Sequence, residues 1–548
     1  MSAVAVTPVP VGSSAYAGWP VAVGFIVRRN WLRMLVWLLV LAALIAIVVI
    51  SQRATFPTQA DRTAYAGIAN TPAVAALTGL PYAAGTIGGI LNIKIWMTDA
   101  IALAFAVIFL VTRNGRAEEE TGRTELLRAG VLGRHAYTVA NWLVFAVFSV
   151  LVGLACAGAA IGEGLPAYGA LVMGASFTGV AIAFLGVAAL TGQLAQTSRG
   201  ANGLASAILG ITYLLRAGGD LSAKGTVPGG LSWASPLGWG QAMRSYGDNN
   251  WAPFILLVGT GLVLCLIALR LEAMRDLGAG ILPDRAGPRS ASALTRTPFG
   301  LTLRLQRGSI LGWVLGVLVG ALFFGEVATA MAKLLSGHNS TNITRAFLGG
   351  VSGDVLKGLM GYFTMADGLL IAAFVLQSVA TIHAEEADGS TELQWTGAIS
   401  RIRWAASRMA VPALLSLLLL ALSGLAEGAS YGAAIKDPGQ AGVYFGAALA
   451  YWPTMLLVIG FVTLCAAWIP RASASVTWAA YGLVVVVSMF GELFKLPARV
   501  ANNTPFTAIE HMTTGHFSAL PLVVMLVLAI VFGVLGLVRL RTRDAVTG

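Results

Sequence analysis

The chain has 548 residues, of which 57% are hydrophobic and only 11% are charged, and its mean hydropathy is +0.79. Soluble domains carry roughly 25% charged residues, so this composition excludes an ordinary soluble protein and predicts a polytopic membrane protein. The net charge of +11 does not indicate a nucleic-acid partner, because the basic residues lie mostly in short segments between apolar runs, where they set topology and meet anionic lipid head groups. No block is polar enough to form a separate soluble domain.

The first half contains six apolar segments. A polar start leads into residues 19–29, which are expected to lie along the membrane surface as an amphipathic helix. Residues 216–250 are rich in glycine and are expected to form a loop or a re-entrant piece. The six spans are predicted at about residues 34–50, 95–111, 136–159, 170–194, 203–215 and 251–271.

The second half repeats this order after a linker rich in Pro, Gly, Ser and Arg. Met97-Thr98-Asp99 matches Met365-Ala366-Asp367, and Arg275-Asp276 matches Arg543-Asp544, at nearly the same offset. The fold class is therefore predicted to be all-α, with twelve transmembrane helices as two tandem six-helix halves. The expected domains are residues 1–275, a cytosolic linker with an amphipathic entry helix at 276–306, and residues 307–548. The second six spans are predicted at about residues 310–322, 368–381, 405–425, 447–468, 475–490 and 520–538.

Arginine placement predicts the orientation. Most arginines fall in loops on one side of the predicted spans, whereas all six lysines fall on the other side. By the positive-inside rule, the arginine-rich side faces the cytosol. We therefore expect a multi-pass protein of the plasma (inner) membrane, with both termini and the linker in the cytosol.

A charged segment occurs twice, at Glu118–Leu126 and Glu385–Leu393, in each case between the second and third spans of its half. The copies are 267 positions apart (385 − 118), close to half of the chain. A strongly polar segment just below the bilayer cannot touch cargo inside the membrane, but it can touch a cytosolic partner. The residues identical in the two copies are Glu118/Glu385, Glu119/Glu386, Gly122/Gly389, Thr124/Thr391, Glu125/Glu392 and Leu126/Leu393.

Each copy is expected to form a helix whose first-turn carboxylates complement the helix dipole. Leu126 in the first copy, and Leu393 and Trp395 in the second, would supply an apolar face for a groove on the partner. The alternative interpretation is a solvated charge run that caps two membrane helices. The repetition of Gly, Thr, Glu and Leu at matching positions favours docking, because generic caps need not share them.

A second span that leads into Glu-Glu-x-x-Gly-x-Thr-Glu-Leu resembles the coupling segment of type-2 ATP-binding-cassette (ABC) exporter permeases. The duplicated form, with Arg275-Asp276-Leu277-Gly278 after the sixth span, is similar to the tetronasin-resistance-like branch of actinobacteria, which is associated with multidrug and antibiotic efflux. The resemblance covers essentially the whole chain. It implies a permease that receives two copies of a cytosolic ABC ATPase subunit, with the Glu-rich segments as the contacts. Trp395 stands where the first copy has Arg128, so the two contacts are expected to be unequal.

The sequence contains no Gly-x-x-x-x-Gly-Lys-Ser/Thr motif, so it offers no P-loop for ATP phosphates. No cofactor is expected on this chain, and ATP and Mg²⁺ are expected in the partner ATPase. Its three cysteines lie in apolar runs, and no histidine pairs with a Cys or carboxylate at metal-ligand spacing, so no metal site is predicted. No nucleophile–base pattern is visible, and the chain is not expected to be an enzyme.

Residues of a transport pathway are predicted from polarity and from aromatic faces. Asp99 and Asp367 are expected at the outer ends of spans two and eight, and Glu163 and Glu427 at the outer ends of spans three and nine. They are candidates for an outer gate or a cation-attracting mouth; the alternative is solvation at the interface, with helix capping by the two aspartates. No carboxylate is placed at mid-membrane, which argues against a proton-driven carrier. Candidates that line a cavity, for which interhelical packing is the alternative, are Phe105, Phe109, Ser206, Phe374, Gln377 and Tyr481.

The sequence thus predicts the permease subunit of an ATP-driven exporter that moves hydrophobic or amphipathic drugs, antibiotics or lipids out of the cell. One alternative is an ion- or proton-coupled secondary transporter with internal repeats. Another is a membrane-embedded enzyme or an assembly scaffold, for which the expected His/Asp/Glu cluster on one helix face is missing.

Overall fold

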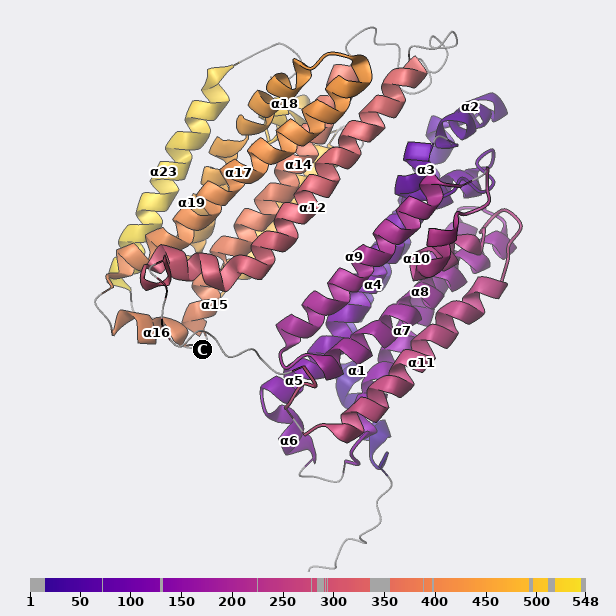
Figure 1. The fold of residues 1–548 in the computed structure, drawn as a ribbon, viewed down its shortest axis with the longest axis horizontal. Coiled ribbons are helices and arrows are strands. Elements are labelled where there is room, and N and C mark those ends of the chain that lie inside the picture. Colours follow the sequence, from indigo (N-terminus) through magenta and orange to yellow (C-terminus); the bar gives the residue numbers. More distant parts are fainter. Residues whose placement is uncertain are drawn as a thin grey trace, which may run out of the picture. The chain divides into compact units, whose positions relative to one another are not determined.

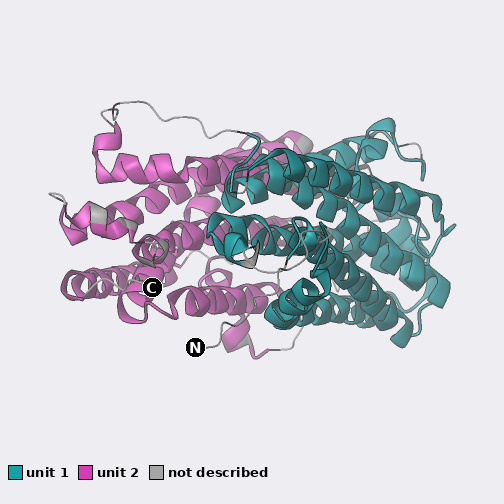
Figure 2. Cartoon of the chain, turned by 90° about the horizontal axis from the view of Figure 1, so that it is seen from below, with its two compact units in different colours: residues 1–286 teal, residues 287–548 magenta. Residues whose placement is uncertain are grey.

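The computed structural model describes residues 15–70, 72–128, 132–223, 225–276, 278–282, 290, 292, 294–335, 355–387, 389–396, 399–491, 496–510 and 518–543. Within these ranges the chain forms helices joined by turns and loops, without an extended strand (Figure 1). The all-α prediction is confirmed for this part of the chain. The chain divides into two compact units, residues 1–286 and 287–548, and each has its own hydrophobic core (Figure 2).

Unit 1 is a bundle of long helices with short helices at both ends (Figure 1). Its α-helices are α1 (Trp19–Thr55), α2 (Gln59–Ala69), α3 (Pro72–Thr78), α4 (Ile87–Asn114), α5 (Arg116–Glu120), α6 (Arg123–Arg128), α7 (Ala136–Gly162), α8 (Ala167–Leu194), α9 (Ser198–Leu221), α10 (Pro236–Ala242) and α11 (Ala252–Met274), and a 3₁₀ turn, η1 (Gly230–Ala234), precedes α10.

Helix α8 lies at the centre of unit 1, where it packs against α4, α7, α9 and α11. Small residues permit the closest contacts. A Cβ atom placed on Gly153 of α7 would lie 2.4 Å from the carbonyl oxygen of Gly174 of α8, and one on Gly174 would lie 2.3 Å from that of Gly153. Close backbone approach at small residues is the usual way in which membrane helices associate. Helices α1 and α11 instead expose large apolar side chains, as expected of lipid-facing helices.

Unit 2 has a similar organisation. Helix α17 packs against α12, α14 and α18, and α19 packs against α23. Its helices are α12 (Pro298–Leu335), α14 (Val355–Val379), α15 (Thr381–Ala387), α16 (Ser390–Trp395), α17 (Arg401–Ile435), α18 (Gln440–Leu449), α19 (Trp452–Trp468), α20 (Ser473–Phe490), α21 (Ala498–Ala501), α22 (Thr507–Glu510) and α23 (Ala519–Thr542), preceded by a 3₁₀ turn, η2 (Leu294–Arg296).

Ten helical segments among the described residues are long and apolar enough to cross a membrane. Each contains one of the twelve predicted spans. The other two predicted spans, at 203–215 and 475–490, lie within α9 and α20. Helix α9 carries Arg216 and Asp220 and is less apolar, and the apolar part of α20, Ser473–Met489, is short for a span. The count of twelve spans therefore remains a prediction.

Two helices begin earlier than the sequence suggested. Residues 19–29 do not form a separate surface helix, because α1 continues from Trp19 to Thr55 without a break. Asn30, which follows the basic pair, lies buried within α1, and its side-chain amide donates to the carbonyl of Ile26 and to Asn114 of α4. Helix α12 likewise begins at Pro298, inside the expected linker, since proline suits the first turn of a helix.

Candidate coupling segments

The first Glu-rich segment forms two short helices rather than one. Helix α5 contains Glu118 and Glu119 in its first turn, and α6 contains Glu125 in its first turn. Between them Gly122 has φ +72°, a left-handed conformation that favours glycine. The pair of helices lies at one end of the unit 1 bundle, opposite α2 and α3 (Figure 1).

Three carboxylates of this segment bind other parts of unit 1. Glu118 is 3% exposed and accepts a hydrogen bond from Arg29 of α1 at 2.6 Å. Glu119 lies 2.9 Å from the guanidinium of Arg116 and 2.8 Å from that of Arg275, which follows α11. Paired and desolvated charges of this kind anchor the segment to the ends of α1 and α11. The docking prediction treated Glu118 and Glu119 as contact residues, but their carboxylates point inward.

Glu120 completes this anchoring. Its carboxylate accepts hydrogen bonds from the backbone N–H of Ser198, at 2.9 Å, and from the Ser198 hydroxyl, at 2.7 Å. Ser198 is the first residue of α9. The segment is therefore attached to three helices of the bundle, so a force applied to α5 and α6 would reach α1, α9 and α11 together.

Other residues of the segment face outward. Glu125 is exposed, and Leu126 is 78% exposed. A recess of about 390 Å³ beside them is lined by Phe25, Arg29, Glu118, Arg123 and Leu126. An exposed leucine next to a recess with aromatic and charged walls is the surface that a partner could contact. Thr124, which precedes Glu125, is buried and belongs to the inner side of the segment.

The second segment repeats this construction in unit 2. Gly389 has φ +75° and separates α15 from α16, and Glu392 is exposed in the first turn of α16. Glu386 is 2% exposed and lies 2.5 Å from the guanidinium of Arg543, which follows α23. Thr391, like Thr124, is buried. The side chain of Leu393 lies outside the described residues.

Each unit therefore contains an equivalent ion pair, Glu119 with Arg275 in unit 1 and Glu386 with Arg543 in unit 2. A second arginine supports each pair. Arg134 donates to the carbonyls of Glu272 and Ala273 at the end of α11, and Arg401 donates to the carbonyl of Arg543. Basic groups at these positions satisfy carbonyls left free at a helix end. The Arg-Asp landmark of the sequence is thus part of the anchor of each repeated segment.

The segments differ in their remaining contacts. Glu385 pairs with Arg408 of α17 at 2.7 Å, whereas its counterpart Glu118 pairs with α1. Trp395 does not project outward as a free anchor. Its ring lies 5.6 Å from that of Trp404 in an edge-on arrangement, and the Arg401 guanidinium lies over it at 4.5 Å. Trp395 is therefore half-buried against α17, and the exposed surfaces of the two segments are unequal.

The structure corrects the placement of three carboxylates. Asp99 and Asp367 are each 1% exposed inside α4 and α14, so they are not caps at helix ends; Thr86 caps α4 instead. Glu427, expected at the end of a span, is fully buried inside α17 and accepts a hydrogen bond from Thr364 at 3.1 Å. Neither oxygen of Asp99 or Asp367 has a hydrogen-bond partner in the described part of the chain. The sequence analysis placed no carboxylate at mid-membrane, whereas Asp99 and Asp367 lie near the middle of α4 and α14.

The remaining pathway candidates have different surroundings within their own units. Phe105 and Phe109 stack on α4 with ring centroids 5.7 Å apart, and Phe109 is 46% exposed. Phe374 instead lies in the core of unit 2, and Gln377 accepts a hydrogen bond from the Trp313 indole at 2.7 Å. Ser206 is half-buried on α9.

Tyr481 of α20 borders a small apolar pocket in unit 2. The pocket measures about 250 Å³ and lies between α19, α20 and α23, with the aromatic rings of Phe461, Phe506 and Phe532 in its wall. The Tyr481 hydroxyl donates to the carbonyl of Leu369 at 2.8 Å, which fixes its ring at the edge of the pocket. A pocket lined in this way suits an apolar group.

Sequence reasoning found the carboxylates of the segments but missed their partners. Arg29 and Arg408 lie far along the chain from the glutamates that they bind, and they were assigned only to membrane topology. Arg275 and Arg543 carried a signal, because they recur at the offset of the repeat. That shared offset could have indicated a contact with the repeated glutamates.

Comparison with known proteins agrees with a membrane transporter built from long apolar helices. Residues 295–541 match the family described as the C-terminal domain of the multidrug efflux system permease Rv1217c. The chain is also 31% identical over 542 residues to the multidrug efflux system permease protein Rv1217c of Mycobacterium tuberculosis, which covers 98% of this chain and 96% of that protein. The chain therefore belongs to this family of multidrug efflux system permeases.

Proposed function

We propose that this chain is the translocation subunit of an ATP-driven ABC exporter, of the type-2, tetronasin-resistance-like kind. One observation carries the proposal: both Glu-rich segments have the same helix–glycine–helix form, the same buried Glu–Arg anchor and the same outward glutamate, Glu125 or Glu392. A rigidly anchored, exposed element that occurs once in each unit fits two copies of a cytosolic ATPase. ATP and Mg²⁺ would bind in that partner.

In this proposal, the chain has two six-span halves, residues 1–275 and residues 307–548. Helix α9 is span five and helix α20 is span eleven. Residues 276–306 form the linker and the entry helix. Both termini face the cytosol of a cell bounded by the plasma membrane. Hydrolysis in the partner moves each segment, and the anchors pass the movement to α11 and α23. The cargo is a hydrophobic or amphipathic compound, such as a drug, antibiotic or lipid, in keeping with the apolar pocket at Tyr481.

The test is charge reversal of the exposed glutamates, Glu125→Lys with Glu392→Lys. We expect loss of the co-purifying nucleotide-binding subunit and of efflux, with unchanged thermal stability of the permease. Glu163→Lys, at the opposite end of unit 1, is the matched control and should retain both. Survival of ATPase association in the double variant would refute docking through α6 and α16.

A second candidate is an ion- or proton-coupled carrier. The observation that favours it is the burial of Asp99, Asp367 and Glu427 inside long apolar helices. Intramembrane carboxylates commonly mark ion or proton sites. Efflux from vesicles driven by an imposed proton gradient, without ATP, would favour this candidate; efflux that requires ATP when no gradient is present would favour the exporter.

A further inference from the structure

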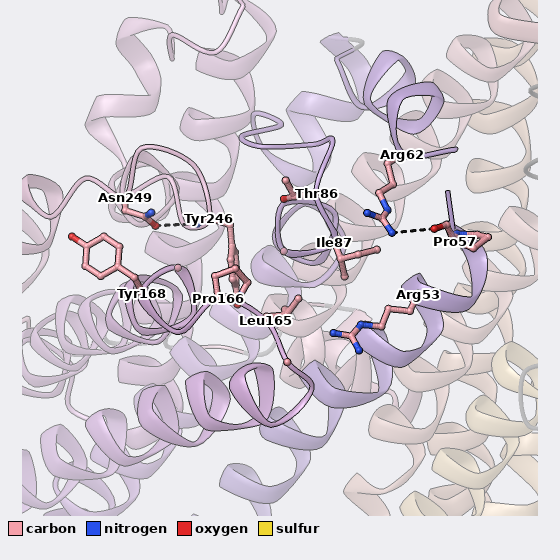
Figure 3. Close-up of a pocket in the computed structure, with 13 residues that line it drawn as sticks. Arg53, Pro57, Arg62, Thr86, Ile87, Leu165, Pro166, Tyr168, Tyr246 and Asn249 are labelled. Atoms are coloured by element: carbon pink, nitrogen blue, oxygen red, sulfur yellow. Dashed lines mark hydrogen bonds between the residues drawn. The ribbon is translucent and has the colours of Figure 1, made fainter. Parts of the chain in front are cut away.

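Figure 3 shows a pocket in unit 1, which lies where α1 ends and α2 follows, at the end of the bundle opposite α5 and α6 (Figure 1). Its volume is about 630 Å³, and none of its lining residues belongs to the Glu-rich segments or to the pathway candidates. The wall is formed by the end of α1, the starts of α4 and α8, and the turn at residues 246–249. Its chemistry is therefore independent of the coupling role proposed above.

Two arginines give the pocket its charge. Arg53 and Arg62 line it, and their guanidinium groups extend into the same space from α1 and α2 (Figure 3). Arg53 donates to the carbonyl of Glu163. Arg62 donates to the carbonyls of Phe56 and Pro57, and both of these bonds are 3.1 Å long. A guanidinium has five N–H donors, so these carbonyls leave several donors on each arginine for a ligand.

These guanidinium groups form no ion pair in the described part of the chain, although the Asp61 carboxylate acts on Arg62 through its charge. No acidic residue within the described ranges lines the pocket. The nearest acid in the sequence, Asp61, has its carboxylate bonded to the hydroxyl and backbone N–H of Thr58, at 2.6 and 3.0 Å. These hydrogen bonds lower the pKa of Asp61, so its carboxylate stays ionised and remains bonded to Thr58.

Two helix N-termini point their positive ends at the same space. Ile87 and Gly88 of the first turn of α4, and Tyr168 and Gly169 of the first turn of α8, line the pocket. Thr86 caps α4 by accepting a hydrogen bond from the N–H of Gly89. Pro166, before α8, provides no side-chain cap, so the first N–H groups of α8 lack a side-chain acceptor. Free N–H groups and aligned peptide dipoles at a helix start favour an anion.

Tyr246 holds the two helix starts at a fixed separation. A Cβ atom placed on Gly88 or on Gly169 would lie 2.5 or 2.4 Å from the Tyr246 ring, so the ring is wedged between two glycines. Burial raises the pKa of Tyr246, which keeps the phenol neutral and adds no negative charge to the site. The pocket is thus built from packed elements, and Leu165, Pro166 and Ile87 give it an apolar wall.

We propose that this pocket binds a phosphate group, held by Arg53, Arg62 and the N-termini of α4 and α8. The apolar wall and the exposed Ile50 of α1, one turn before Arg53, suit the phosphate of an anionic bilayer lipid whose chains lie along α1. Free inorganic phosphate has the same head-group chemistry, and the experiment separates the two sources.

The test uses the purified full chain in nanodiscs of phosphatidylcholine with titrated phosphatidylglycerol, and native mass spectrometry to count retained lipid. We expect wild type to retain phosphatidylglycerol in preference to phosphatidylcholine. Arg53→Gln with Arg62→Gln should weaken retention by roughly tenfold or more, because charge-assisted hydrogen bonds are lost. Arg53→Lys with Arg62→Lys, which keeps both charges, should retain most of the binding.

The matched control is Arg471→Gln with Arg499→Gln, which removes the same charge from two exposed arginines of unit 2 and should bind as wild type. Thermal unfolding separates lost binding from lost structure: phosphatidylglycerol should raise the melting temperature of wild type but not of the Gln pair. A parallel titration uses inorganic phosphate in place of the lipid. If phosphate raises the melting temperature of wild type but not of the Gln pair, the site binds a free anion. Equal retention of both lipids, with no response to inorganic phosphate, would overturn the proposal.

Discussion

At the scale of single residues, the repeated glutamates fall into two groups that the sequence cannot separate. Glu119 and Glu386 are paired with arginines, whereas Glu125 and Glu392 are exposed. The distinction depends on which side of α5, α6, α15 and α16 faces the bundle. Glu119 and Glu386 therefore support the segments, and under the proposed function Glu125 and Glu392 are the residues that would contact the ATPase.

Removal of a buried anchor should therefore destabilise the permease by itself. Glu386→Gln removes the carboxylate charge that pairs with Arg543 at a largely buried position. Breaking a buried ion pair from one side costs about 3–5 kcal/mol. We expect a clearly lower melting temperature for Glu386→Gln in the absence of any partner protein. Glu392→Gln, at an exposed glutamate six residues further along the chain, should melt as wild type. Equal melting temperatures for all three proteins would show that Glu386 is not an anchor.

The buried aspartates should behave in the opposite way. A carboxylate without a hydrogen-bond partner in a low-dielectric interior is costly, so Asp99→Asn and Asp367→Asn are expected to retain or raise the melting temperature. Asp220→Asn is the contrasting variant, because Asp220 accepts from Ser232 at 2.7 Å and from Arg216 at 3.2 Å. It should lower stability by about 3 kcal/mol.

A loss of stability in Asp99→Asn as large as that in Asp220→Asn would mean that Asp99 has a stabilising partner. Loss of efflux at unchanged stability would instead give the aspartates a role in transport and strengthen the carrier alternative.

At the scale of helices, the contact of α7 with α8 depends on two facing glycines. A methyl group on Gly153 would meet the Thr178 hydroxyl at 2.3 Å and the Gly174 carbonyl at 2.4 Å. Backbone atoms on both sides leave little room to relax, so overpacking should cost about 1–3 kcal/mol. Gly153→Ala is therefore expected to lower the melting temperature.

Gly158 of the same helix is the matched control, since nothing lies within 4 Å of a Cβ placed there. Gly158→Ala should be neutral or slightly stabilising, because alanine is favoured over glycine in a helix by about 1 kcal/mol. If the two alanine variants had the same melting temperature, the claim that α7 and α8 approach closely at Gly153 would be contradicted.

The predictions from sequence succeeded where periodic apolar runs decide the structure. Ten of the predicted spans coincide with long apolar helices, because a run of about twenty apolar residues has few other stable forms in a membrane. The predicted boundaries of the helices were less accurate than the predicted positions of the spans. Asp99 was placed at a helix end because charge usually marks one, but α4 begins at Ile87, after its cap Thr86, and Asp99 lies inside the helix.

The segments show the same limit. The pattern predicted a polar element with first-turn carboxylates, and α5 has them. Each segment is divided into two helices at a glycine, Gly122 or Gly389, because this glycine has a positive φ. That angle is seen in the structure and not in the sequence. The inward direction of Trp395 depends on contacts with Trp404 and Arg401, and no spacing along the chain encodes it.

At the scale of the whole molecule, the duplication gives each unit one exposed element of related but unequal surface. In unit 1 this element borders a recess of about 390 Å³ with Phe25 in its wall, whereas in unit 2 Trp395 is packed against α17. We therefore expect the two single reversals to differ: Glu125→Lys and Glu392→Lys should weaken association with the ATPase to different extents. Quantitative pull-down of the nucleotide-binding subunit would measure this, and identical losses would indicate two equivalent contacts.

The central claim is that two ATPase subunits bind this permease through the repeated segments. The most direct measurement is gentle purification of the tagged chain from its native membrane, followed by quantitative mass spectrometry of what co-purifies. The account predicts a nucleotide-binding subunit at two copies per permease, which is lost when Glu125 and Glu392 are both reversed. A chain that is isolated alone, and that moves its cargo on a proton gradient without ATP, would contradict it.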